Sequence, residues 1–186
     1  VVLDQWNVSG SERMEPERRT AMAEWLERDL VGARPRADWI IVAGHQPMFN
    51  VAAHGSEWGR ETILPILYRH GVDIVIGGHS HLYERFIPIA PSGAHPIHFL
   101  VAGGGGAITY PPVPSPLLAR VHAAPHYCLF RVDGERLELA VKGSDGVTLD
   151  RLILTKSNGA LPPSLRSATV PLDDAIRLAK AFKGIA

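Results

Sequence analysis

The chain has 186 residues, of which 46% are hydrophobic, and this length is sufficient for one domain with a sizeable core. Its 19 basic and 19 acidic residues give a formal net charge of zero, which argues against nucleic acid or an anionic membrane as a partner. No apolar run approaches the length of a membrane span. The single cysteine, Cys128, excludes an intrachain disulfide, and its apolar neighbours predict a buried, inert thiol.

The first half of the chain alternates between expected strands and expected helices. Apolar runs predict strands at 1–3, 39–43 and 74–76. Helical spacing of apolar residues predicts helices over 15–30 and 56–70, and Pro65 either kinks the second helix or marks its start. This order of strands and helices is typical of a parallel sheet. The helical residues expected to face the core are Met22, Trp25, Leu26, Leu30, Ile63, Leu64 and Leu67.

The pattern changes after residue 96. Strands are expected at 97–102, 127–132, 136–142 and 147–154. Asp-Gly pairs at 133–134 and 145–146 are strong hairpin signals, so the last three strands should form an antiparallel meander. The four glycines at 103–106 allow either a phosphate cradle or a flexible turn beside the site. Because no Lys-Ser or Lys-Thr follows them, they are not a P-loop, and the turn is favoured.

The chain is expected to divide at residue 156. Residues 1–156 should form one domain, whereas residues 157–186 should form a linker and a short terminal helix. We expect Asp173 and Asp174 to cap this helix. Its inward-facing residues should be Ile176, Ala179 and Phe182.

Two histidines follow the apolar strand at 74–76. Gly77 and Gly78 allow the backbone to turn sharply after the strand. His79 and His81 are two residues apart, so in extended backbone both imidazoles leave on the same side. This spacing predicts ligands for one metal or for two adjacent metals, and the alternative is a pair of surface histidines in a turn.

A second segment repeats this pattern and favours the metal hypothesis. The strand at 39–43 is followed by Gly44, His45, Gln46 and Pro47. Ligands of open α/β sheets gather beyond the carboxyl ends of the strands. Two neighbouring strands that each end in glycine and histidine should therefore bring three imidazoles to one edge.

Together, the sequences GHQP at 44–47 and GGHSHLYER at 77–85 resemble the last two motifs of the calcineurin-like metallophosphoesterases, and most closely the purple acid phosphatases. His54 matches a further histidine of that family, and WLERDL at 25–30 resembles its WLxxxL helix. The resemblance covers about residues 1–154. It implies an α/β fold, namely the C-terminal half of a four-layer αββα sandwich.

The resemblance also implies a reaction and a role for each histidine. His45 and His79 would bind one metal, His81 would bind the other, and His54 would donate a proton or bind the phosphate. The alternative for His54 is a loop histidine bonded to the backbone. Two ions of iron, zinc or manganese would support hydrolysis of a phosphomonoester by a metal-bridging hydroxide. We also expect Glu84 and Arg85 to form a structural ion pair.

The family's other metal-binding motifs are expected on its N-terminal side, and the sequence does not contain them. They are the DxH or DxG, GDxxY and GNH or GN motifs, which carry the carboxylate, tyrosine and asparagine ligands. Without them three imidazoles cannot complete two coordination spheres. We therefore expect the chain to be the C-terminal half of such an enzyme and inactive alone, with the missing N-terminal half as its partner and secretion or the periplasm slightly favoured.

Two other interpretations stay open. One is a non-catalytic module of the same fold that binds a partner or a single metal. The other is an unrelated histidine-rich α/β domain. The sequence does not identify the substrate or the metal.

Overall fold

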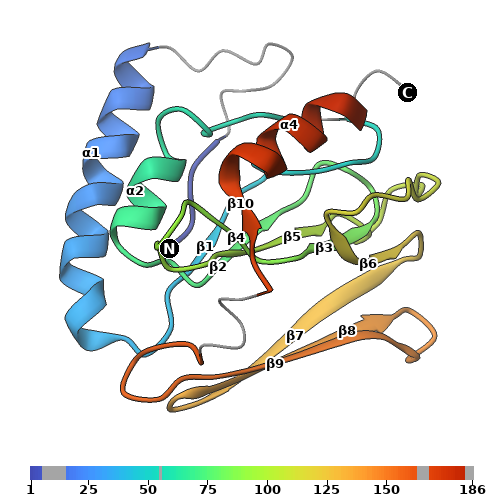
Figure 1. Ribbon diagram of the computed structural model, residues 1–186. Coiled ribbons are helices and arrows are strands. Elements are labelled where there is room, and N and C mark those ends of the chain that lie inside the picture. The colour runs from blue at the N-terminus through green and yellow to red at the C-terminus, as the bar shows by residue number, and fades with distance from the viewer. Residues whose placement is uncertain (6–15, 55, 163–167, 183–186) are drawn as a thin grey trace.

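The computed structural model describes residues 1–5, 16–54, 56–162 and 168–182. Its elements form three layers: helices, a five-stranded sheet and a three-stranded sheet (Figure 1). The helices are α1 (Pro16–Ala33), the short 3-10 helix η2 (Arg34–Arg36), α2 (Leu64–Arg69) and α4 (Leu172–Phe182). Among these described helices, none has the length and apolar character needed to cross a bilayer.

The five-stranded sheet has the order β1-β2-β5-β3-β6. Its strands are β1 (Ile41–Ala43), β2 (Ile74–Gly77), β3 (Tyr83–Phe86), β5 (His98–Ala102) and β6 (Leu118–His122). As the sequence predicts, β1 and β2 are parallel. Strand β5 is also parallel to β2, which the sequence did not indicate, and β3 runs antiparallel between β5 and β6. The expected strand at 1–3 is shorter: only Val2 forms a parallel bridge, beside Ala43 of β1.

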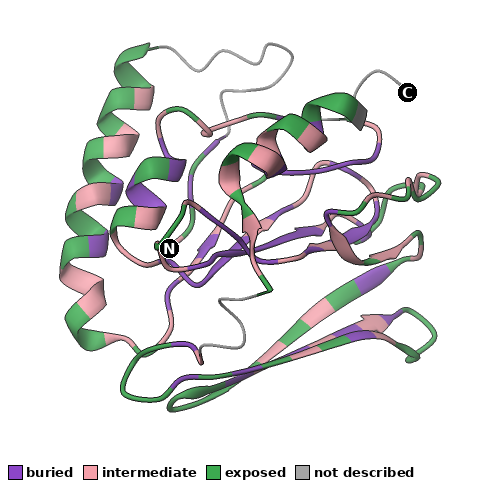
Figure 2. Ribbon diagram, viewed as in Figure 1, coloured by how far each residue is buried: buried purple, intermediate pink, exposed green. Residues whose placement is uncertain are grey.

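Helices cover one face of this sheet (Figures 1 and 2). Leu26 and Leu30 of α1 and Leu67 of α2 have no exposed surface and pack in one core with Phe99 of β5. The predicted burial of Ile63 and Leu64 is also confirmed, and Met22 packs at the edge of this core. Trp25, in contrast, is 43% exposed, so its predicted place in the core is wrong.

The other face of the five-stranded sheet packs on an antiparallel sheet of β7 (His126–Asp133), β8 (Arg136–Gly143) and β9 (Thr148–Thr155). This confirms the predicted meander. Leu137, Leu139 and Val141 point inward and are fully buried, whereas Leu129 and Ile153 are exposed. The three observed layers correspond to three layers of the expected αββα sandwich. Cys128 is half-buried, and burial raises the pKa of its thiol to about 11.

Several elements differ from expectation. Helix α2 begins only at Leu64, because Pro65 fits the first turn of a helix and not its interior. Asp173 and Asp174 lie within the first turn of α4, where their negative charges interact favourably with the positive end of the helix dipole. They do not precede the helix, so they are not its N-caps. The sequence did not indicate β3, β6 or the two-residue strands β4 (Ile89–Ala90) and β10 (Val170–Pro171). Strands β4 and β10 pair with each other. Residues 163–164 of the expected linker, residue 15 and the Phe182 side chain lie outside the described part of the chain.

A buried ion pair joins the start of β2 to the end of β9. Asp73 Oδ1 lies 2.6 Å from Lys156 Nζ, and neither side chain is exposed. The Asp73 carboxylate also accepts the backbone N–H of Ile40 at 2.9 Å and lies 3.0 Å from His95 Nε2. Burial alone would raise the pKa of Asp73, but the hydrogen bonds from His95 and Lys156 outweigh it and hold the pKa below its usual range.

Glycines permit close contact among the loops at the carboxyl edge of the five-stranded sheet. A Cβ on Gly77 would lie 2.7 Å from the Pro47 backbone, so the two histidine-bearing turns touch. A Cβ on Gly103 would overlap the carbonyl oxygen of Ser80, between the two histidines of the second turn. Gly105 has open space around its Cβ position. The expected glycine turn therefore lies beside the site, and its first residue must be glycine for steric reasons.

Replacement of Asp73 should show the contribution of the buried pair. We expect Asp73→Asn to lower the free energy of unfolding by about 3–5 kcal/mol, because Lys156 is left as an uncompensated buried charge. A folded-state pKa below the unfolded value means that this contribution is present above the unfolded pKa and is lost as the pH falls through the folded pKa. Denaturant unfolding at pH 7 and near pH 3 should show the difference shrinking in acid.

The control for this experiment is Asp174→Asn. Asp174 pairs with Arg177 at 2.9 Å on an exposed face of α4, where water screens the pair. An equal loss of stability in both variants would contradict the importance of burial.

The glycine contacts are tested by a matched pair of substitutions. Gly103→Ala should lower the free energy of unfolding by about 2–3 kcal/mol, because the new methyl group forces the Ser80 backbone to move. Gly105→Ala should change it by less than about 0.5 kcal/mol, since its Cβ meets nothing. Thermal unfolding of both variants decides this; equal midpoints would show that the two turns are not closely packed.

Candidate metal centre

The pairing of β1 with β2 brings two histidines together. Ala43 is the parallel partner of Ile76, and each strand is followed by a glycine turn that ends in histidine. The N–H of Gly78 donates to the carbonyl of His45 at 2.8 Å, which joins the two turns directly. As a result, His45 Nε2 lies 3.2 Å from His79 Nδ1, with the rings nearly perpendicular.

This separation fits two ligands of one metal ion. Two imidazole nitrogens that bind one tetrahedral zinc are about 3.3 Å apart, because each Zn–N bond is about 2.0–2.1 Å. The observed 3.2 Å is close to this value. A neutral imidazole is the form that binds a metal, and burial together with the neighbouring His45, His54 and His81 lowers the pKa of His79.

His54 and His81 lie next to this pair. The His54 ring centroid is 5.6 Å from that of His79 and 6.2 Å from that of His81. His81 Nδ1 lies 3.2 Å from the carbonyl oxygen of Ile108, and a carbonyl can only accept. Nδ1 is therefore the protonated nitrogen, which leaves Nε2 of His81 with a lone pair for a metal.

Tyr110 is a residue of this cluster that the sequence did not reveal. Its ring stacks on His54 at 5.1 Å and on His81 at 4.7 Å, with planes within 18° of parallel. Its backbone N–H donates to the carbonyl of His81 at 3.1 Å. Tyr110 comes from the proline-rich loop after β5, where no periodic pattern indicates which side chains face the site.

Two histidines of the cluster have left-handed backbone. His54 has φ 62° and His79 has φ 61°, a backbone region that residues other than glycine rarely adopt. Such strain persists where the surrounding structure enforces it, and it is concentrated at functional sites. The two positive φ values therefore favour a cluster whose backbone is held in place by its neighbours.

The described residues do not by themselves form a complete metal site. Among them, no group of three or more histidine, cysteine, aspartate or glutamate side chains comes together as a set that could hold one ion. The His45–His79 pair is the best-formed part of the cluster, and His81 lies to one side of it. Further ligands would be needed to complete a site.

The expected ion pair between Glu84 and Arg85 is wrong. Successive residues of a strand point to opposite faces, so the two side chains diverge. Glu84 accepts backbone N–H groups from Val51 and Ala52, whereas Arg85 donates to Asp150 of β9 at 2.6 Å.

The other five histidines lie away from the cluster or make other contacts. His70 Nε2 lies 2.6 Å from Glu27 of α1, so it joins two helices beyond its predicted effect on the helix dipole. His98 is buried, neither ring nitrogen has a hydrogen-bond partner among the residues that the structure describes, and burial lowers its pKa to about 4. His126 Nδ1 donates to the carbonyl of Ala124. The remaining two are His95 and His122.

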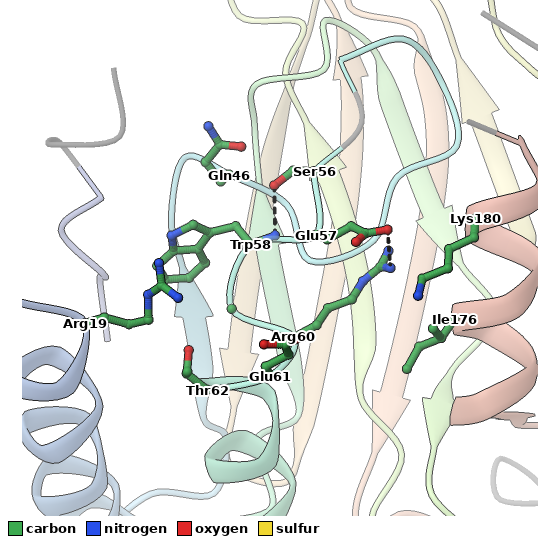
Figure 3. Close-up of a pocket in the computed structure, with 11 residues that line it drawn as sticks. Arg19, Gln46, Ser56, Glu57, Trp58, Arg60, Glu61, Thr62, Ile176 and Lys180 are labelled. Atoms are coloured by element: carbon green, nitrogen blue, oxygen red, sulfur yellow. Dashed lines mark hydrogen bonds and ion pairs between the residues drawn. The ribbon is translucent and has the colours of Figure 1, made fainter. Parts of the chain in front are cut away.

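A pocket of about 450 Å³ lies beside the loop that carries His54 (Figure 3). Arg60 extends along it, 3.4 Å from Glu57, and its guanidinium also packs over the Phe49 ring. The Nε of Arg60 donates to the carbonyl of Met48 at 2.6 Å. The lining residues are Arg19, Gln46, Ser56, Glu57, Trp58, Gly59, Arg60, Glu61, Thr62, Ile176 and Lys180.

Comparison with known proteins shows which family the first part of the chain is similar to. The calcineurin-like phosphoesterase family matches residues 1–83. Purple acid phosphatase 22 of Arabidopsis thaliana is 34% identical over 125 residues, which cover 61% of this chain and 29% of that protein. The chain therefore corresponds to less than a third of the length of this relative.

Solved structures agree on the fold. A purple acid phosphatase from yellow lupin seeds superposes with a TM-score of 0.64 at 23% identity, covering 76% of this chain and 30% of that one. GAP50 of Plasmodium, described as the anchor in the inner membrane complex, superposes with a TM-score of 0.69 at 17% identity. The superposition covers 97% of this chain and 54% of the GAP50 chain. With the motifs at 44–47 and 77–85, these similarities lead to one conclusion: residues 1–83 match the calcineurin-like phosphoesterase family, and the chain is similar to part of the purple acid phosphatases.

Proposed function

We propose that this chain provides the histidine side of a two-metal phosphoesterase that hydrolyses phosphomonoesters. The observation that carries the proposal is the 3.2 Å separation of His45 Nε2 and His79 Nδ1 at the edge where the parallel strands end. The similarity to purple acid phosphatases supports an acid phosphatase reaction. Because the match covers only 29% of the length of this relative, we assign the activity to a protein that is longer than residues 1–186.

Each histidine would have a separate role. His45 and His79 would bind one metal, and His81 would bind the second through Nε2. Imidazole ligands suit zinc, iron and manganese. When bound, two such ions acidify a water molecule and neutralise charge on the phosphoryl group. The carboxylate and amide ligands that complete the site would come from a part of the protein outside this sequence.

His54 would act on the leaving group. It is exposed and lies against the rings of His79, His81 and Tyr110, so a bound phosphate would be within its reach. An alcohol leaves a phosphomonoester more easily when its oxygen receives a proton as the bond breaks. We therefore assign proton donation to His54, with phosphate binding as its second role.

One observation favours a second candidate function. The described residues contain no group of three ligands for one ion, and this fits a non-catalytic module of the same fold that binds a partner. Such a module would fold stably and show no turnover in any natural form of the protein. Substitution of His45 and His79 distinguishes the phosphoesterase from the non-catalytic module.

Removal of either paired histidine should abolish catalysis. We expect His45→Ala and His79→Ala, made in the full-length gene product, to lower kcat/KM for p-nitrophenyl phosphate about 1000-fold or more. Metal charge stabilisation is worth several kcal/mol, and each 1.4 kcal/mol is a factor of ten.

His70→Ala is the matched control, because His70 pairs with Glu27 between two helices. It should keep the rate of the unsubstituted protein. Full activity after loss of His45 or His79 would rule out the proposed reaction, and a folded full-length protein without turnover would favour the non-catalytic module.

A further inference from the structure

Glu84 is a buried carboxylate whose partners are backbone N–H groups. It lies on β3, three residues after His81, and has no exposed surface. Its Oε1 accepts the N–H of Ala52 at 3.0 Å, and both of its oxygens lie 3.2 Å from the N–H of Val51. Val51 and Ala52 are themselves only 5% exposed, so these N–H groups have no ready access to water.

This arrangement is expensive to maintain. A buried carboxylate is costly in the charged form, and burial raises the pKa of Glu84 to about 7 even though the two N–H groups favour ionisation. An apolar residue at this position would avoid the cost but would leave both backbone donors unsatisfied. The carboxylate therefore fixes the chain at Val51 and Ala52.

The fixed chain is the start of the loop that carries His54. Ser80 Oγ donates to the carbonyl of Ala53 at 2.8 Å, which ties the residue before His54 to the turn between His79 and His81. The Asn50 side chain closes the loop, since it donates to the carbonyl of Ala52 and accepts the N–H of Ser56. These contacts lie on both sides of His54, whose backbone is left-handed at φ 62°.

We propose that Glu84 is a positioning residue for His54. By holding Val51 and Ala52, it sets the path of the loop so that the His54 ring stacks on Tyr110 and faces His79. Glu84 does not touch the substrate. This role rests on the proposed function, in which His54 supplies a proton to the leaving group.

The first test uses leaving groups that differ in their need for a proton. Nitrophenolate leaves readily without one, whereas the alkoxide of glycerol phosphate does not. In the full-length protein, His54→Ala should lower kcat for glycerol phosphate at least about 100-fold more than for p-nitrophenyl phosphate. Glu84→Gln should shift this ratio in the same direction by about tenfold or more, because an amide cannot accept hydrogen bonds with both of its terminal atoms.

The double variant shows whether the two residues act together. If Glu84 acts through His54, the variant with both substitutions should be no slower on glycerol phosphate than His54→Ala alone. Additive losses, or an equal loss on both substrates in Glu84→Gln, would overturn the proposal. Asp150→Asn is the control for general destabilisation, because Asp150 pairs with Arg85 on the opposite face of β3 and should leave the ratio unchanged.

The second test does not depend on activity. In NMR spectra, Glu84→Gln should shift the His54 ring resonances as the ring leaves the Tyr110 stack, and should speed amide exchange at Val51 and Ala52. Unchanged His54 resonances would overturn the proposal even if the protein proved inactive. If Glu84→Gln does not fold, Glu84→Asp withdraws the carboxylate by one methylene and is judged by the same resonances.

Discussion

The site depends on the parallel pairing of β1 with β2 and on the contact between the turns that follow them. The register that places Ala43 beside Ile76 also places His45 and His79 at the same edge. The hydrogen bond from Gly78 to His45 and the contact of Gly77 with Pro47 then fix the separation of the imidazoles. A shift of one residue in this register would move the histidines apart and leave no two-nitrogen site.

Buried polar groups hold the layers around this edge. Asp73 and Lys156 join the five-stranded sheet to the end of β9, at the ends of the parallel strands opposite the histidines. Arg85 and Asp150 join the same two sheets from the middle of β3. Because β3 begins two residues after His81, a side chain on one face of it contacts the second sheet while Glu84 on the other face holds the His54 loop. Strand β3 therefore connects the core to the turn that carries His79 and His81 and to the loop that carries His54.

Much of this could be predicted from the sequence, where the signals are local. Continuous apolar runs predict the strands that become β1 and β2, Asp-Gly pairs predict the meander, and glycine followed by histidine indicates which edge carries the histidines. Strand β3 is not evident in the sequence, because it consists of a charged pair between two aromatic residues and has no β-branched residue. The place of Tyr110 is not visible in the sequence, and the ion pair expected for Glu84 is wrong, for a different reason: both roles depend on contacts between segments that are far apart in the sequence. Trp25 follows helical spacing but lies at the edge of the buried stripe, and spacing alone does not reveal where that stripe ends.

The central claim is that His45, His79 and His81 are metal ligands, and the most direct test is the metal content of the full-length protein purified without chelators. Elemental analysis should find close to two ions per chain, and His79→Ala should lose at least one of them. A value near zero for a folded, unsubstituted protein would contradict the account, because the imidazoles would then form a cluster that holds no metal.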